Sequence, residues 1–167
     1  AALADPRQTR LILVARAQAS TLREAARTRE ELAAIGLTGP YLAINGLLPE
    51  AEAAHDPLAA ALWQREHAAL AALPAALHDL PADAIALRPF NLVGIDALRS
   101  LLSDEQVGVG APSPRAQEGW GGEVEPLPRL AHLIDELAAD QHGLILLMGK
   151  GGVGKTTLAA LLAQVYA

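Results

Sequence analysis

The chain has 167 residues, of which 51% are hydrophobic but only 3% aromatic, so its core must be built mainly from Ala, Leu, Ile and Val. A formal net charge of −6, without any Lys/Arg cluster, argues against a nucleic-acid-binding surface. The absence of cysteine excludes disulfides and thiolate metal sites within this stretch. No apolar run approaches the ~18 residues that a membrane-spanning helix needs, and Asp5-Pro6-Arg7 interrupts any signal-peptide pattern. These features predict a soluble, cytoplasmic α/β protein.

The first strand and helix are predicted near the N-terminus. Thr9–Ala15 is a short apolar run rich in branched residues, which is typical of a buried strand. Thr21, followed at the required spacing by Glu24, resembles a capping box that opens a helix running to about Ile35. Gly36 is placed to end this helix.

A second strand and helix follow. We expect Tyr41–Asn45 to be a strand, Gly46 to mark the turn after it, and Glu50–His55 to be a polar loop. Asp56-Pro57 combines a favourable N-cap with a proline at the first helical position. A helix is therefore predicted from this point to about Leu73.

A third strand, Ala84–Leu87, and a short helix, Gly94–Leu102, complete the pattern. Strands and helices thus alternate over residues 9–102, which predicts a parallel sheet covered by helices. The expected fold class is α/β.

The composition changes after this region. Residues 103–128 hold five of the 14 glycines and four of the 11 prolines, with almost no apolar periodicity, which predicts a linker. Residues 129–141 then carry apolar side chains at helical spacing, so we expect a helix there.

The most specific motif lies near the C-terminus. An apolar run at residues 143–148, which predicts a strand, is followed by the pattern G-x-x-x-x-G-K-[ST] and then by a helical pattern. Strand, glycine-rich loop and helix in this order indicate a phosphate-binding loop. The motif comprises Gly149, Lys150, Gly151, Gly152, Val153, Gly154, Lys155, Thr156 and Thr157.

Each residue type in this loop has a chemical reason to be there. Glycines allow consecutive backbone N–H groups to surround a phosphate, and the helix that starts at Lys155 directs its unpaired N–H groups at the same anion. Lys155 would reach the β- and γ-phosphates, and the Thr156 hydroxyl would bind Mg²⁺. The chain has 13 Lys and Arg residues, yet its only two lysines are Lys150 and Lys155. The alternative is a glycine-rich turn that binds nothing.

The position of the loop bears on the domain organisation. Such a loop normally follows the first strand of its domain, but here few residues come after it, which leaves no room for a Walker B Asp or the rest of the sheet. We therefore expect parts of two tandem domains: residues 1–102 as the C-terminal part of the first, 103–128 as the linker, and 129–167 as the N-terminal part of the second. The alternative is a permuted single domain whose pieces pair across the linker.

The loop also carries a resemblance. With Lys150 inside it, K-G-G-V-G-K-T-T resembles the deviant Walker A pattern of SIMIBI-type P-loop NTPases, which include the MinD/ParA proteins and the nitrogenase iron protein. The stretches TRLILVARAQASTL, YLAINGLLP, RPFNLVG and GLILLMGKGGVGKTT resemble the central part of the ArsA family of arsenite- and antimonite-transporting ATPases. The resemblance covers residues 5–167 except the linker.

This resemblance implies roles for individual residues. Lys150 matches the signature lysine, which would reach the nucleotide of the facing half. Lys150 and Lys155 would then both act in catalysis. Asn45, Pro89 and Phe90 match positions that contact the adenine of ATP. The alternatives are that Asn45 merely forms a turn beside a glycine and that Phe90 belongs to the core.

The resemblance also implies a function: an ATPase that uses ATP and Mg²⁺ to energise arsenite or antimonite efflux. Its partner would be a membrane pump subunit, with a metallochaperone as a further candidate. It would lie in the cytoplasm, peripherally at the inner face of the plasma membrane. The family's metalloid site uses thiolates, so those residues would lie outside this cysteine-free segment. The alternatives are a tail-anchored-protein targeting ATPase and a MinD/ParA-type positioning ATPase.

Overall fold

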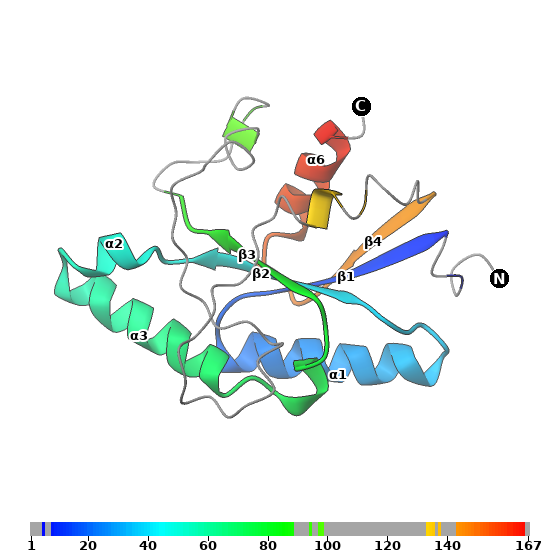
Figure 1. The fold of residues 1–167 in the computed structure, drawn as a ribbon, viewed down its shortest axis with the longest axis horizontal. Helices are drawn as coiled ribbons and strands as arrows, with labels where there is room; N and C mark the ends of the chain where they lie inside the picture. The colour runs from blue at the N-terminus through cyan, green and yellow to red at the C-terminus, as the bar shows by residue number, and fades with distance from the viewer. Residues whose placement is uncertain are drawn as a thin grey trace.

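The computed structural model describes residues 5, 8–88, 94, 97–98, 133–135, 137 and 143–165. Within these residues, four strands form one parallel sheet in the order β3-β2-β1-β4 (Figure 1). The strands are β1 (Thr9–Ala15), β2 (Tyr41–Leu47), β3 (Ala82–Ala86) and β4 (Leu144–Met148). The helices are α1 (Ala19–Ala34), α2 (Glu50–Ala53), α3 (Pro57–Ala71), the short 3₁₀ helix η2 (Ala75–Leu77) and α6 (Lys155–Val165).

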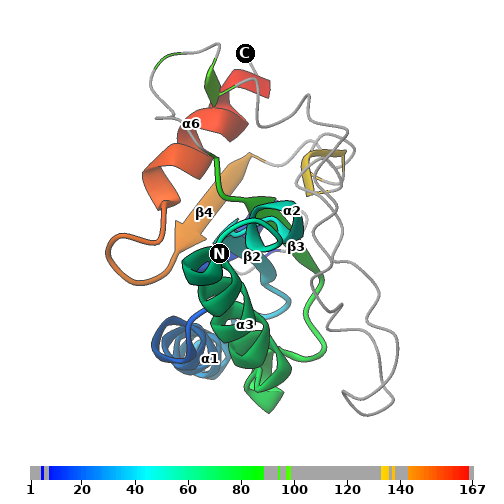
Figure 2. The ribbon, with the colours of Figure 1, turned by 90° about the vertical axis from the view of Figure 1, so that its left-hand side faces the viewer.

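Helices cover both faces of the sheet, with α1 and α3 on one side and α6 on the other (Figures 1 and 2). Alternate residues of β1 belong to two separate cores: Leu11 and Leu13 pack with residues of α1 and α3, whereas Ile12 and Val14 pack with residues of α6. A strand buried on both faces needs apolar residues throughout, which is why its sequence does not alternate with polar residues. The predicted parallel α/β fold is confirmed. None of the helices in the described ranges is long and apolar enough to cross a bilayer.

Strand β1 is paired on both sides. Ile12 lies opposite Tyr41 of β2 and opposite Leu147 of β4. Strand β1 was assigned to the first of two tandem domains and β4 to the second, yet they are neighbours in one sheet. Such a pairing is expected if the chain forms a permuted single domain. The division at residues 102 and 128 stays a prediction, since residues 103–128 lie outside the described ranges.

The predicted start of α1 is wrong. Gln18 is the N-cap residue, and it makes no side-chain capping hydrogen bond. The Thr21 hydroxyl donates instead to the backbone oxygens of Arg16, at 2.7 Å, and Gln18, at 3.0 Å. Its side chain is therefore used to tie the first turn of the helix to the end of β1. The predicted C-terminal end is confirmed, because α1 stops at Ala34 and Gly36 has a φ of +83°.

Two further predictions around β2 are wrong. Gly46 does not form the turn after the strand but lies within it, with a φ of +73°, where the β2–β3 register shifts between Asn45 and Leu47. Such an irregularity is a β-bulge, in which glycine adopts a conformation that other residues avoid. The expected polar loop at residues 50–55 contains the short helix α2. By contrast, the Asp56 N-cap is confirmed, since its carboxylate accepts a hydrogen bond from the Ala59 amide at 2.8 Å.

The remaining predicted elements are described in part. β3 starts at Ala82, two residues earlier than expected. Two predicted helices, at residues 94–102 and 129–141, are described at a few positions only. In the first range, residues 97–98 are helical; in the second, residues 133–135 and 137 are helical. Leu133, Ile134 and Leu137 are buried in the core on the α6 side of the sheet.

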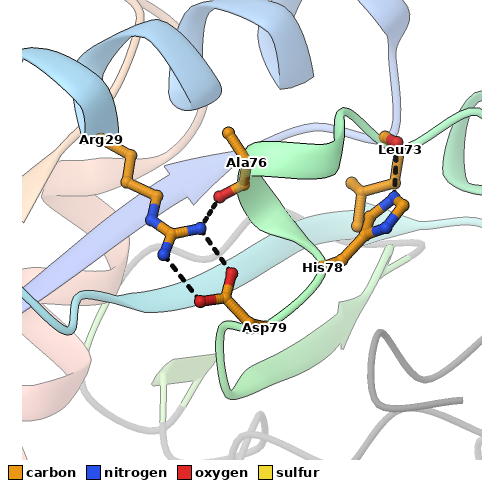
Figure 3. A network of polar contacts seen from close by, with 5 residues as sticks. All are labelled: Arg29, Leu73, Ala76, His78 and Asp79. Atoms are coloured by element: carbon orange, nitrogen blue, oxygen red, sulfur yellow. Dashed lines mark hydrogen bonds and ion pairs between the residues drawn. The ribbon is translucent and has the colours of Figure 1, made fainter. Parts of the chain in front are cut away.

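A cluster of polar contacts joins α1 to the segment before β3 (Figure 3). The Arg29 guanidinium donates to both carboxylate oxygens of Asp79, at 2.5 and 2.8 Å, and to the carbonyl oxygen of Ala76. Next to it, a ring nitrogen of His78 lies 2.8 Å from the Leu73 carbonyl oxygen. Hydrogen bonding to Arg29 lowers the pKa of Asp79. This cluster fixes α1 against the loop that leads into β3.

A buried carboxylate contacts the opposite side of the sheet. Asp83 of β3 is fully buried and accepts hydrogen bonds from the Tyr41 hydroxyl and from the Leu133 backbone amide, both at 2.8 Å. Burying a carboxylate is costly unless it is hydrogen-bonded, and these two donors offset the cost of burying Asp83. Asp83 thereby connects the helical residues around Leu133 to the sheet.

Candidate phosphate-binding site

The glycine-rich loop connects β4 to α6 at the carboxyl edge of the sheet, as predicted. Its backbone is left-handed at three glycines: φ is +151° at Gly149, +80° at Gly152 and +93° at Gly154. Only glycine adopts such angles without strain. The loop conformation therefore explains why glycines stand at these positions of the motif.

Two of these glycines are also required by close packing. A Cβ atom at Gly149 would overlap with the carbonyl oxygen of Val14 in β1, and one at Gly154 would overlap with the side-chain amide of Asn45. At Gly151 and Gly152, by contrast, a Cβ would meet nothing within 4 Å. The loop is thus pressed onto the sheet at Gly149 and Gly154, whereas Gly151 and Gly152 in its middle face open space.

Lys155 lies over the loop from the first position of α6. Its Nζ donates to the carbonyl oxygens of Gly149, at 2.9 Å, and Lys150, at 2.8 Å. The ammonium group is therefore held within the curve of the loop, beside the N-terminal end of the helix, where a negative charge is stabilised.

The other predicted residues of the loop differ in their exposure. Lys150 and Thr156 are exposed, and Thr157 is half-buried. Val153 is buried in the same core as Leu158 and Leu161 of α6, so its side chain anchors the loop. The loop thus presents backbone N–H groups, two cations and hydroxyl groups, which suits it to binding phosphates.

The structure brings one distant predicted residue to the loop. The Asn45 side-chain amide, at the bulge in β2, donates to the Val153 carbonyl oxygen at 2.9 Å. Parallel strands place their carboxyl ends at one edge, which explains how these residues meet. The adenine contact of Asn45 stays a prediction, and Pro89 and Phe90 lie outside the described residues.

Sequence reasoning missed Arg16, which follows directly after β1 at the same edge. Its guanidinium Nη2 lies 3.4 Å from the Gly46 carbonyl oxygen, and a Cβ at Gly46 would lie 2.9 Å from the Arg16 Cζ. A cation directly after a buried parallel strand was the available signal, because ligands bind at the carboxyl ends of such strands.

Metal binding by the protein alone has no support in the part of the chain that the structure describes. No group of three or more His, Asp or Glu side chains is arranged there to hold an ion. A magnesium ion at this site would depend on phosphate oxygens together with Thr156, since Mg²⁺ commonly binds through few protein ligands and substrate phosphates.

Comparison with known proteins gives one family match. The family described as anion-transporting ATPase matches residues 1–104, which is more than half of the chain. An arsenical pump-driving ATPase of Escherichia coli is 56% identical over 162 residues, which make up 97% of this chain and 27% of that protein. The protein of the same name from Acidiphilium multivorum is also 56% identical over the same coverage, and a second one from Escherichia coli is 54% identical. The chain thus spans about a quarter of the length of these relatives.

Proposed function

Because the chain belongs to the anion-transporting ATPase family, we propose that it contributes an ATP-binding site to an ATPase that energises arsenite or antimonite efflux through a membrane pump. The curated relatives named above are arsenical pump-driving ATPases. Their names favour this function over tail-anchored-protein targeting and over MinD/ParA-type positioning.

The observation that carries the proposal is the loop geometry. The Lys155 ammonium is held by the Gly149 and Lys150 carbonyl oxygens, and the glycines at positions 151 and 152 of the same loop have open space beside them. The phosphates of ATP would accept hydrogen bonds from the loop N–H groups. The Lys155 ammonium would then exchange its carbonyl contacts for contacts to phosphate oxygens. The Thr156 hydroxyl would be one ligand of Mg²⁺, which neutralises charge on the phosphates when it is bound.

Lys150 has a different proposed role. It is exposed, so its ammonium would be able to reach a nucleotide bound by a facing domain. A cation supplied in this way stabilises the charge that develops on the transferred phosphoryl group and is worth roughly 10³–10⁵ in rate. We place Lys150 and Lys155 together as the catalytic cations, and Asn45, Pro89 and Phe90 around the adenine.

The proposed setting follows from the same family. The protein would work in the cytoplasm, peripherally at the inner face of the plasma membrane, with a membrane efflux subunit as its partner. Arsenite or antimonite would be bound by residues outside this cysteine-free chain, and a metallochaperone is a candidate supplier.

A binding experiment tests the core of the proposal. The chain is titrated with ATP in the presence of Mg²⁺ by calorimetry, and Lys155→Ala is expected to lower the affinity at least about tenfold, because a charge-assisted contact to phosphate is worth ~1.5–3 kcal/mol. Arg23→Ala, at an exposed position of α1, is the matched control and should bind as the wild type does. Equal affinity of the wild type and Lys155→Ala would refute the site. Metalloid-stimulated ATP hydrolysis by the full-length protein then tests the efflux role.

A further inference from the structure

We propose that Arg16 is a positioning residue of the nucleotide site: its guanidinium supports the Gly46 bulge and thereby holds Asn45, the proposed adenine contact, in its position beside the phosphate-binding loop. The inference rests on the proposed function, because it assigns a specificity role within the same site. In the part of the chain that the structure describes, the Arg16 side chain makes its hydrogen bond to Gly46 of β2, so we expect it to act on the site through that strand.

The location of Arg16 is the first step. It directly follows β1, which lies between β2 and β4 in the sheet (Figure 1). β2 carries Asn45, and β4 leads into the phosphate-binding loop. Arg16 is therefore the residue at the carboxyl edge between the two strands that supply the candidate site.

The second step is how Arg16 is held. Its carbonyl oxygen accepts hydrogen bonds from the Gln18 amide and from the Thr21 hydroxyl, both at 2.7 Å. These contacts fix its backbone against the start of α1. Only the side chain remains free to take different positions, and the side chain is directed to Gly46.

The third step is the contact with Gly46. The guanidinium donates a long hydrogen bond of 3.4 Å to the Gly46 carbonyl oxygen, and three of its atoms lie within 3.2 Å of the place where a Cβ would stand. Gly46 thus provides both a φ of +73° and the space that the planar group occupies. Within the described residues, this is the single hydrogen bond of the Arg16 side chain, and no carboxylate pairs with it.

The final step links Gly46 to the loop. The residue before it, Asn45, donates to the Val153 carbonyl oxygen at 2.9 Å and packs against Gly154. Because the β2–β3 register shifts between Asn45 and Leu47, the bulge sets the direction of the Asn45 side chain. A guanidinium packed on the bulge limits its movement and so limits the movement of the amide.

The first test needs no nucleotide. The side-chain amide signals of Asn45 are identified in a ¹⁵N–¹H NMR spectrum by their loss in Asn45→Ala. They should shift or broaden in Arg16→Ala, while Arg23→Ala, on the exposed side of α1, leaves them unchanged. Unchanged Asn45 signals in a folded Arg16→Ala would overturn the inference. If Arg16→Ala does not fold, Arg16→Lys keeps one donor without the planar group and should shift the same signals.

The second test measures base specificity. Arg16→Ala should lower the preference for ATP over GTP by about 3- to 10-fold, the value of one hydrogen bond to the base, while the affinity for GTP stays unchanged. Gly46→Ala, which displaces the guanidinium, should have the same effect. An equal loss of affinity for ATP and GTP would show that Arg16 acts on the phosphates, and would overturn the positioning role. A wild type that binds no ATP refutes the proposed function itself, without any Arg16 variant.

Discussion

Gly149 and Gly151 stand close together in the same loop but carry different constraints. Gly149 has a positive φ, and a side chain there would collide with the backbone of β1, which cannot move aside without opening the sheet. Gly151 has no positive φ and open space around it. The requirement for glycine is thus a property of each position and not of the motif as a whole.

The two positions allow a matched prediction. Gly149→Ala should destabilise the fold by at least about 1–3 kcal/mol, because it adds backbone strain as well as a steric clash. Gly151→Ala should leave the free energy of unfolding within about 0.5 kcal/mol of the wild type. Urea unfolding followed by circular dichroism measures both. A Gly149→Ala variant as stable as Gly151→Ala would show that the loop does not pack on Val14 as described.

Among the elements, α1 is held by polar contacts at both of its ends. Thr21 ties its first turn to the end of β1, and Arg29 joins its last turns to Asp79 and Ala76 (Figure 3). Arg29 is largely covered, whereas the Asp79 side chain is 69% exposed, so solvent screening keeps the ion pair itself below about 1 kcal/mol. The Ala76 carbonyl gains a charged donor in addition.

Replacing Arg29 tests this cluster and its pH dependence. Arg29→Ala should lower the free energy of unfolding at neutral pH by about 1–2 kcal/mol, since both the ion pair and the hydrogen bond to Ala76 are lost. The pKa of Asp79 is lowered in the folded state, so the ion-pair part is fully present above the ordinary pKa of Asp. It is lost as the pH falls through the lowered value.

The difference in the free energy of unfolding between the wild type and Arg29→Ala should therefore become smaller at acidic pH. Urea titrations at a series of pH values measure this difference. Arg27→Ala is the control on the same helix, because the Arg27–Glu31 pair is exposed on both sides. It should leave the stability unchanged. If the stability difference between the wild type and Arg29→Ala stays constant at pH values well below the usual pKa range of Asp, the ion pair is not its source.

Element boundaries show where the sequence was insufficient. Asp56-Pro57 is a strong local signal, and the α3 start was predicted correctly from it. Thr21 and Gly46 carry equally strong local signals, for a cap and for a turn, but tertiary contacts redirect both. The Thr21 hydroxyl finds the Arg16 carbonyl, and Gly46 is placed in a bulge against the Arg16 guanidinium. Neither contact leaves a trace in local sequence patterns.

For the whole molecule, the loop and its helix were predictable because all their constraints are local. The contact between Asn45 and Val153 was not, since it depends on which strands lie side by side. The permuted alternative expected the two pieces to pair across the linker, but it did not identify β1 and β4 as the strands that pair. Sheet order is a long-range property, and local propensity does not determine it.

The Lys150 assignment is a prediction at this scale, because the proposed role involves a nucleotide bound by a facing domain of a longer protein. In that protein, Lys150→Ala should keep ATP binding but lower metalloid-stimulated hydrolysis by roughly 10³-fold or more, as the loss of a charge at the transition state would. Steady-state hydrolysis with and without antimonite measures this, with ATP affinity measured in parallel. Undiminished stimulation in Lys150→Ala would contradict the role.

The position of β1 between β2 and β4 has a consequence for the order of folding. Pairing of Ile12 with Tyr41 closes a short loop of the chain, whereas pairing with its other neighbour, Leu147, closes a much longer one. Pairing across a longer chain costs more closure entropy and forms more slowly. We therefore expect β1, β2 and β3 to assemble first, and β4 to dock last and to detach first. Amide hydrogens of β4 should exchange with solvent faster than those of β2, and a nucleotide bound at the loop should slow them most.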